Sequence, residues 1–392
     1  MKPSLFQQLR SLPRPAWILF GGTFINRFGT FVMPFLILYL KGIGYSTTQA
    51  GLALGAYGAG HIIASASGGH LADRVGRRHT IVLSMFGSAI SMMALSQARG
   101  FPAIVALTFV TGAFSELYRP ASHALLADLI PPEQRMLSFA MYRFAVNLGF
   151  AAGPATAGFL AEHSFFYLFA GDALTSVVYG VIAVLALPQG LRTYVQGERA
   201  GEAIRVALRD RPFVIFLLAS VCIASVDFQM GSSLPLYITS LGFTPRIYGM
   251  LISANGVLII LFELLITNYT QRLRARPAIA IGYLLAGTGF AMTGLARTVP
   301  ALLATVVVWT IGEMVSSPLA AAYVAELAPE RYRGRYMGLF VLTWSAGMLV
   351  GPPLGTWAFA RHSALLWTAS AVLGVIAASL LLVSAPRRTS SW

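Results

Sequence analysis

The chain has 392 residues, of which 56% are hydrophobic and 11% are charged, and its mean hydropathy is +0.70. A soluble domain carries about a quarter charged residues, so this composition excludes an ordinary soluble enzyme and indicates a polytopic membrane protein. The net charge of +14 would suggest a nucleic-acid partner for a soluble protein. Here the basic residues cluster between apolar segments, so we expect contact with membrane lipids and no nucleic acid.

The sequence gives no sign of a metal site or a cofactor. Its single cysteine, Cys222, lies inside an apolar segment and excludes an internal disulfide. The six histidines lack the spacing of metal ligands, and His61, which falls within an apolar segment, is interpreted as a polar packing contact. No G-x-x-x-x-G-K-[ST] loop is present, which argues against ATP-driven pumping.

Apolar segments of spanning length recur along the whole chain. A transmembrane helix needs about 20 apolar residues, and on this basis we predict an all-α membrane protein with twelve transmembrane helices. The predicted spans are 16–40, 49–72, 79–98, 102–127, 134–161, 165–187, 212–240, 247–270, 277–296, 300–325, 334–360 and 363–385.

The basic residues are distributed unequally between the two sides of this arrangement. The two termini and the links on their side carry 20 of them, whereas the links on the other side carry five, which are Lys41, Arg99, Arg246, Arg297 and Arg361. Basic residues next to membrane segments stay on the cytoplasmic side. We therefore predict a multi-pass protein with both termini in the cytoplasm.

The longest polar stretch, Pro188–Arg211, divides the chain. We predict an N-terminal six-helix half (1–187), a cytoplasmic linker (188–211) and a C-terminal six-helix half (212–392). Within the linker, a short amphipathic surface helix is predicted from five charged residues: Glu198, Arg199, Glu202, Arg205 and Arg209.

An internal repeat supports two pseudo-symmetric halves. At an offset of 198 residues, Gly153-Pro154 aligns with Gly351-Pro352, and Pro120 aligns with Pro318. Because each repeat contains an even number of spans, both halves have the same orientation in the membrane.

The most specific short motif is Gly69-His70-Leu71-Ala72-Asp73-Arg74-Val75-Gly76-Arg77-Arg78, between two apolar segments. Gly69 and Gly76 are expected to supply a tight turn. The pattern closely resembles the signature loop between the second and third helices of the major facilitator superfamily of transporters. The resemblance covers essentially the whole chain and implies the twelve-helix fold of that superfamily.

The same resemblance implies a conformational latch on the cytoplasmic side. The matching residues are Gly69, Asp73, Arg74, Gly76 and Arg77, with Asp128 as the acid that pairs with the loop arginine. Such a latch would stabilise the outward-facing state. The alternatives are a basic turn that only fixes topology, or a surface salt bridge worth under about 1 kcal/mol.

A second motif lies in the predicted fifth helix. Asn147–Pro154 resembles the glycine-proline motif of proton-coupled drug antiporters, and Gly149, Gly153 and Pro154 carry it. Small residues would let the fifth and eighth helices approach closely, and proline would bend the helix. A second copy at Gly347–Gly355 leaves packing symmetry as an alternative explanation.

Charges within spans are costly and face the protein interior. In the superfamily the first, fourth, seventh and tenth helices line the central cavity. The resemblance therefore implies a substrate cavity lined by Asn26 and Arg27, Glu116 and Arg119, Asp227, and Glu313. Arg143 and Asp172 are interpreted as packing charges, and Glu263 is a further buried acid.

Proton coupling is assigned to three of these acids. A carboxyl group in a cavity of low dielectric constant can bind and release protons near neutral pH. Asp227 and Glu313 have no basic residue within their own spans and rank first, whereas Glu116 lies one turn from Arg119 and ranks third.

Together these features predict a secondary transporter rather than an enzyme. We expect a monomer of the inner membrane that exports small amphipathic compounds in exchange for protons by alternating access, without a cofactor. The alternative is transport of a specific anionic metabolite or sugar on the same fold, with Arg27, Arg119 and Arg143 binding the anion. A membrane enzyme or sensor on this scaffold has no nucleophile motif or metal cluster to support it.

Overall fold

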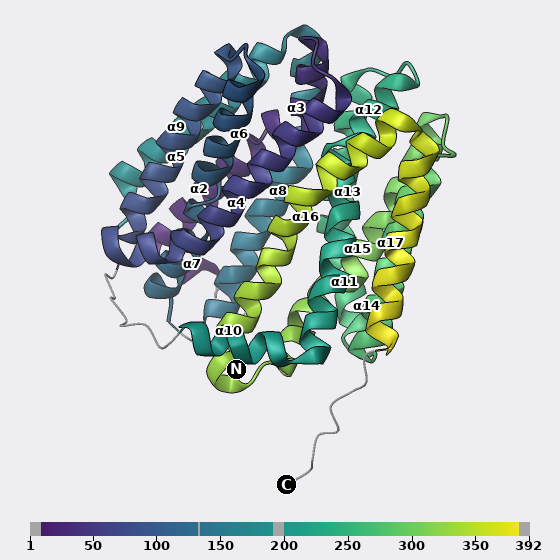
Figure 1. Cartoon of the computed structure of the whole chain (residues 1–392). Helices are drawn as coiled ribbons and strands as arrows, with labels where there is room; N and C mark the ends of the chain where they lie inside the picture. The colour runs from purple at the N-terminus through teal and green to yellow at the C-terminus, as the bar shows by residue number, and fades with distance from the viewer. Residues whose placement is uncertain (1–8, 132–133, 191–199, 384–392) are drawn as a thin grey trace. The chain divides into compact units, whose positions relative to one another are not determined.

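The computed structural model describes residues 9–131, 134–190 and 200–383. Throughout these ranges the chain is built from helices and contains no strand (Figure 1). Ten helical segments of the described chain are long and apolar enough to cross a membrane. The predicted spans 49–72 and 277–296 are also largely helical, as α4 and α14, but these two helices are not among the ten.

The chain divides into two compact units. The first contains Met1–Tyr45, Leu52–Val195 and Phe243–Val257, and the second contains Ser46–Gly51, Gln196–Gly242 and Leu258–Trp392. The described helices before the linker are α2 (Arg14–Phe28), α3 (Val32–Gly42), α4 (Thr47–Val75), α5 (Arg77–Gln97), α6 (Phe101–Ser115), α7 (Tyr118–Leu129), α8 (Arg135–His163) and α9 (Phe165–Ala186).

In the first unit, α5 packs against α6, α7 and α9, and α2 packs against α8 and α9 (Figure 1). The core lies where these helices meet, and its largest members are the fully buried rings of Tyr118 and Tyr179. The two rings pack edge to face with centroids 6.2 Å apart, a favourable arrangement for aromatic pairs.

The remaining helices are α10 (Ala200–Arg209), α11 (Arg211–Asp227), η2 (Phe228–Gly231), α12 (Ser233–Ser240), α13 (Pro245–Thr270), α14 (Ala275–Thr293), α15 (Val299–Leu327), η3 (Glu330–Tyr332), α16 (Arg333–Arg361) and α17 (Ser363–Val383). These helices belong to the second unit, except for residues 245–257 of α13, which belong to the first. There α14 packs against α15 and α17, while α11 packs against α16 and α17 (Figure 1).

Helix α10 is the predicted amphipathic helix of the linker. Glu202, Arg205 and Arg209 are exposed on it, whereas Ala207 is fully buried. The helix packs against α11 and α16 of the same unit. The other two charges assigned to this helix, Glu198 and Arg199, lie outside the described residues.

Three predicted spans are interrupted, and buried polar side chains satisfy the backbone at each break, as a helix inside a membrane requires. Between α2 and α3, the Asp172 carboxylate accepts a hydrogen bond of 3.2 Å from the Val32 N–H. Between α6 and α7, the Ser84 hydroxyl donates to the Phe114 carbonyl and accepts from the Tyr118 N–H. Asp172 was interpreted as a packing charge, and the structure gives it this bond at the start of α3.

The third break is the short η2 between α11 and α12, where Gln229 is buried. Its side-chain amide donates to the carbonyls of Ser225 at 2.9 Å and Gly351 at 2.8 Å. Its oxygen accepts from the Ser233 hydroxyl at 2.7 Å. One glutamine therefore joins the bent helix to α16 within the second unit.

The turn in the signature motif is shorter than predicted. Helix α4 continues to Val75, α5 begins at Arg77, and only Gly76 leaves the helical conformation, with a φ of 106°. The prediction that Gly69 also supplies the turn is wrong, because Gly69 lies inside α4. One residue with positive φ is enough to reverse the chain here, and glycine adopts that conformation without steric cost.

Candidate functional site

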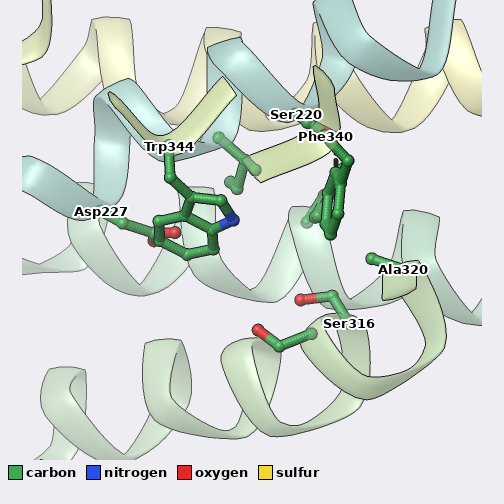
Figure 2. Close-up of a pocket in the computed structure, with 9 residues that line it drawn as sticks. Ser220, Asp227, Ser316, Ala320, Phe340 and Trp344 are labelled. Atoms are coloured by element: carbon green, nitrogen blue, oxygen red, sulfur yellow. Dashed lines mark hydrogen bonds between the residues drawn. The ribbon is translucent and has the colours of Figure 1, made fainter. Parts of the chain in front are cut away.

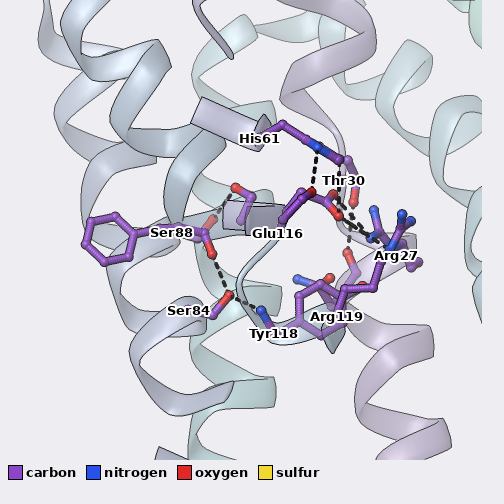
Figure 3. A network of polar contacts seen from close by, with 12 residues as sticks. Arg27, Thr30, His61, Ser84, Ser88, Glu116, Tyr118 and Arg119 are labelled. Carbon is purple, nitrogen blue, oxygen red and sulfur yellow. Dashed lines mark hydrogen bonds and ion pairs between the residues drawn. The ribbon is translucent and has the colours of Figure 1, made fainter. Parts of the chain in front are cut away.

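The first candidate site is a cluster of charges around Glu116, at the break between α6 and α7 (Figure 3). Its carboxylate lies 3.3 Å from Arg27 Nη2 on α2 and 3.4 Å from Arg119 Nε on α7. A third basic group, His61 Nε2 on α4, lies 3.6 Å from the same carboxylate. Three basic side chains from three helices thus converge on one buried acid.

Burial differs within this cluster. The Glu116 side chain is 8% exposed and that of Arg27 is 14% exposed, whereas that of Arg119 is 43% exposed. The Arg27 guanidinium also lies 5.4 Å from the centre of the Tyr118 ring, within range of a cation–π contact. Arg27, His61 and Glu116 therefore form the buried part of the cluster, and Arg119 reaches its accessible edge.

A small polar cavity of about 20 Å³ adjoins this cluster in the first unit. It is lined by Asn26, Arg27, Thr30, Met33, Tyr57, Ser88, Met92, Ser115, Glu116 and Asp172. A water molecule needs at least about 10–15 Å³, so the space suits a single water rather than an organic substrate. Asn26 was predicted to line the cavity, and its amide also contacts the Met85 sulfur at 3.5 Å.

The second candidate site is a pocket in the second unit with Asp227 at one end (Figure 2). Its volume is about 90 Å³. The lining comes from α11, α14, α15 and α16 and comprises Ser220, Ile223, Asp227, Tyr283, Ser316, Ser317, Ala320, Phe340 and Trp344. In Figure 2 the Trp344 ring lies at the Asp227 end, and Phe340 and Ala320 lie at the other.

The charge environment of Asp227 is the reverse of that of Glu116. Among the residues that the structure describes, no lysine, arginine or histidine lines this pocket or forms an ion pair with Asp227. The ionisable group that interacts with Asp227 is a second acid, Glu313 on α15. Glu313 does not line the pocket itself, but it belongs to the same helix as Ser316.

The residues assigned to the latch are partly brought together. Arg77 Nε lies 2.9 Å from Asp128 Oδ2, as the sequence implied, and Arg77 Nη2 lies 3.8 Å from Asp73. The Arg77 and Asp128 side chains are mostly buried, whereas the Asp73 side chain is 44% exposed. Arg74 is exposed on the last turn of α4. Of the two ion pairs of Arg77, the one with Asp128 is therefore the shorter and the more buried.

The glycines of the second motif pack against α2. A Cβ atom at Gly149 would lie 2.7 Å from the Phe28 nitrogen, and one at Gly153 would lie 2.6 Å from the Phe28 carbonyl oxygen. These two glycines face α2, whereas the predicted close approach to the eighth span is made by other small residues of the motif. A Cβ atom at Gly256 of α13 would lie 2.6 Å from the Ala151 Cα atom. Pro154 lies inside α8, one residue after Gly153.

The same packing recurs 198 residues later in the second unit. A Cβ atom at Gly347 would lie 2.5 Å from the Ala224 side chain, and one at Gly351 would lie 2.8 Å from the Ser225 carbonyl oxygen. Both neighbours are on α11, the repeat partner of α2. Close contact between paired helices therefore explains the glycines of both motifs without a contact to substrate.

Sequence reasoning missed two parts of these sites. His61 was read as a packing residue, and its contact with Glu116 depends on how α4 meets α6, which no local pattern states. The hydroxyls of Ser220, Ser316 and Tyr283 were also missed, because serine and tyrosine are common in apolar spans. Ser220 is seven residues before Asp227 on α11, and this helical spacing was the one available signal.

Comparison with known proteins places these sites in a family context. The family model described as "Major Facilitator Superfamily" matches residues 19–245 and 220–392. The chain is 25% identical over 349 residues to the uncharacterized MFS-type transporter YqjV of Bacillus subtilis, covering 87% of this chain and 85% of that protein.

Two relatives have more specific names. One is a Na(+), Li(+), K(+)/H(+) antiporter of Planococcus maritimus, 26% identical over 86% of this chain and 88% of that protein. Another is the multidrug resistance protein MdtH of Cronobacter sakazakii, 26% identical over 88% of this chain and 87% of that protein.

Among solved structures, that of a D-xylose–proton symporter has a TM-score of 0.78 at 17% identity. The match covers 95% of this chain and 97% of that one. At this identity the likeness concerns the fold alone.

Proposed function

The chain belongs to the Major Facilitator Superfamily of membrane transporters, and on this premise we propose that it exports small amphipathic compounds in exchange for protons by alternating access. In this proposal Asp227 carries the proton, with Glu313 beside it. Glu116, together with Arg27 and Arg119, organises the first unit instead of carrying a proton.

The contrast between the two buried acids carries this proposal. Glu116 is contacted by Arg27, Arg119 and His61 at 3.3–3.6 Å. A proton on Glu116 would displace these contacts and leave buried positive charges without a counter-charge, at high cost. Among the residues that the structure describes, Asp227 forms no ion pair, so a proton on Asp227 breaks no ionic contact.

An exchanger needs a group that binds either the proton or the substrate. Asp227 lines a pocket large enough for part of a small molecule, and aromatic rings form much of its wall. A carboxylate in an apolar and aromatic pocket suits amphipathic compounds. One relative is a Na(+), Li(+), K(+)/H(+) antiporter, which supports exchange with protons, and another is a multidrug resistance protein, which supports a drug-like substrate.

The rest of the proposed architecture follows the sequence. We place the protein in the inner membrane as a monomer with both termini in the cytoplasm, and we assign residues 1–187 and 212–392 to two six-helix halves. The Arg77–Asp128 contact of 2.9 Å supports a latch in which Gly69, Asp73, Arg74 and Gly76 take part. We propose that this latch stabilises the outward-facing state, as the resemblance to the superfamily implies.

Transport of a specific anionic metabolite or sugar is the alternative. It would use the arginines of the first unit, but Arg27 and Arg119 already contact Glu116. An anion would therefore have to compete with a carboxylate that is fixed in place. Arg143, the third arginine of this alternative, is exposed on α8. The geometry thus favours the exchange of protons with amphipathic compounds.

Transport by purified protein in proteoliposomes tests the proposal. With an imposed pH gradient, the wild type should accumulate amphipathic compounds from a chemically diverse panel, and dissipation of the gradient should abolish accumulation. Asp227→Asn should retain downhill flux but lose accumulation. Accumulation of anions or sugars alone would favour the alternative, and accumulation by Asp227→Asn at the wild-type rate would place the proton elsewhere.

A further inference from the structure

The Asp227 pocket of the second unit offers hydrogen-bond acceptors in a consistent arrangement. A hydroxyl group has one hydrogen to donate and two lone pairs to accept with. The Ser316 hydroxyl donates to the Gly312 carbonyl at 2.8 Å, and the Ser220 hydroxyl donates to the Phe216 carbonyl at 2.9 Å. Both hydrogens are thus used within the serine's own helix, so each oxygen presents lone pairs to the pocket.

The Tyr283 hydroxyl extends this arrangement. Its oxygen lies 3.2 Å from Ser220 Oγ. Because the Ser220 hydrogen already goes to Phe216, Tyr283 is the donor in this contact, and its own lone pairs remain. The carboxylate of Asp227 adds two further oxygens that accept and do not donate. A ligand therefore has to bring hydrogens to these oxygens, while the Trp344 indole N–H and the Ser317 hydroxyl are the donors of the same lining.

The pocket is negative whenever the Asp227 carboxyl group has lost its proton. Asp227 lines it, Glu313 acts on Asp227 from the neighbouring α15, and the described lining contains no basic side chain. An anion would be repelled, and a neutral hydroxyl compound would leave the carboxylate without a counter-charge. A cation with N–H groups satisfies the charge and the acceptors together.

The aromatic wall narrows the class of cation. Tyr283, Phe340 and Trp344 place three rings around a space of about 90 Å³. Hard metal cations prefer a shell of six or more oxygens, whereas aromatic faces attract organic cations and their apolar carbon chains. The space also exceeds the 10–15 Å³ or so that one water needs.

We propose that this pocket binds the protonated amino group of an organic amine, and that it selects cations carrying N–H donors over quaternary cations that lack them. The proposal rests on the transport function proposed above and names its substrate class. Asp227 neutralises the ammonium charge, Ser220 and Ser316 accept its hydrogens, and Trp344 and Phe340 contact the carbon chain. Proton and amine then compete for one carboxylate.

Equilibrium binding to the purified full chain in detergent, without any gradient, tests this selectivity. Three probes share one carbon skeleton: 2-phenylethylammonium, its N,N,N-trimethyl analogue and neutral 2-phenylethanol. We expect the primary ammonium to bind at least about tenfold more tightly than the trimethyl analogue, since one lost hydrogen bond to a charged group already costs roughly this factor. The alcohol should bind most weakly.

Variants locate the effect. Ser316→Ala should reduce the preference for the primary ammonium by about tenfold, because Ser220 still accepts a hydrogen, whereas Asp227→Asn should weaken the binding of both cations. The matched control is Ser370→Ala on α17, since the Ser370 hydroxyl is equally buried and donates to the Leu366 carbonyl at 3.1 Å but does not line the pocket. This control should bind all three probes as the wild type does.

Four results would overturn the inference: no binding of the primary ammonium, equal binding of the two cations, tighter binding of the alcohol, or an unchanged preference in Ser316→Ala. Displacement of the amine by sodium ions in a manner that depends on Ser316 would instead assign the pocket to a metal cation. Proton-driven accumulation is measured separately in proteoliposomes. If the protein accumulates substrate but binds the two cations equally, only this inference is refuted. If it prefers the primary ammonium but accumulates nothing, only the proposed function is refuted.

Discussion

Replacement of Glu116 by glutamine tests the role assigned to the charge cluster of the first unit. The change keeps the shape of the side chain but removes the one negative charge that Arg27, Arg119 and His61 contact. Buried positive charges then lack a counter-charge. We expect Glu116→Gln to destabilise the protein strongly while it leaves any remaining transport coupled to protons.

The magnitude follows from the buried pair. At the 3.3 Å between Arg27 and Glu116, two unit charges interact by about 5 kcal/mol at an effective dielectric constant of 20. Removing one partner of a buried pair costs roughly 3–5 kcal/mol. We expect about 3 kcal/mol here, because glutamine still offers a carbonyl oxygen and because Arg119, 43% exposed, can turn to water. By the scaling for domains of 150–250 residues, this lowers the melting temperature by about 6–12 °C.

Thermal unfolding of the purified protein in detergent measures this loss. The control is Glu162→Gln on α8, which removes the charge of an exposed glutamate and should shift the melting temperature by less than about 2 °C. The double variant Glu116→Gln/Arg27→Gln should lose less than the sum of the single variants, because it removes both members of the buried pair.

Two results would refute the reasoning about Glu116. A melting temperature of Glu116→Gln within about 1 °C of the wild type would mean that the cluster does not stabilise the fold. Losses that add in the double variant would mean that Arg27 and Glu116 do not depend on each other.

Three further predictions follow from the packing, the latch and the topology. Gly153→Ala should destabilise the protein by more than about 2 kcal/mol, because its Cβ would lie 2.6 Å from a backbone oxygen of α2. The control Gly338→Ala meets open space and should be neutral or stabilising by thermal unfolding. Asp73→Asn should impair transport at near-normal expression, and unchanged transport with unchanged spin-label distances across the cytoplasmic face would reduce the motif to a topology signal. Cysteines at Ser46 and Ser390 should be labelled from outside intact cells only at Ser46, and the reverse pattern would invert the orientation.

Composition and motif spacing were sufficient to predict a helical membrane protein of this superfamily, and the family match confirms that identification. Local spacing also predicted the contact between Glu116 and Arg119, which are three residues apart in the sequence. In the structure Arg119 Nε lies 3.4 Å from Glu116 Oε2. Even this pair lies at a helix break rather than on one continuous helix. Hydropathy cannot reveal such breaks, because apolar residues continue through them.

Contacts between distant segments were beyond sequence reasoning. Arg27 reaches Glu116 across 89 residues, and the Asp227 pocket draws its lining from four helices. The direction in which Gly149 and Gly153 face depends on the rotation of α8 about its axis, which the regular spacing of glycines does not set. Gly69 was wrongly predicted to lie in a turn, because glycine is common in turns, but the structure places it inside helix α4.

The central claim is that Asp227, and not Glu116, carries the proton that is exchanged for substrate. Proton movement driven by a substrate gradient, recorded with a pH-sensitive dye inside proteoliposomes, tests it most directly. We expect an inward substrate gradient to drive protons outward in the wild type. Asp227→Asn should move substrate without protons, and the folded fraction of Glu116→Gln should still exchange the two. Proton movement by Asp227→Asn equal to that of the wild type, or its loss in Glu116→Gln alone, would contradict the account.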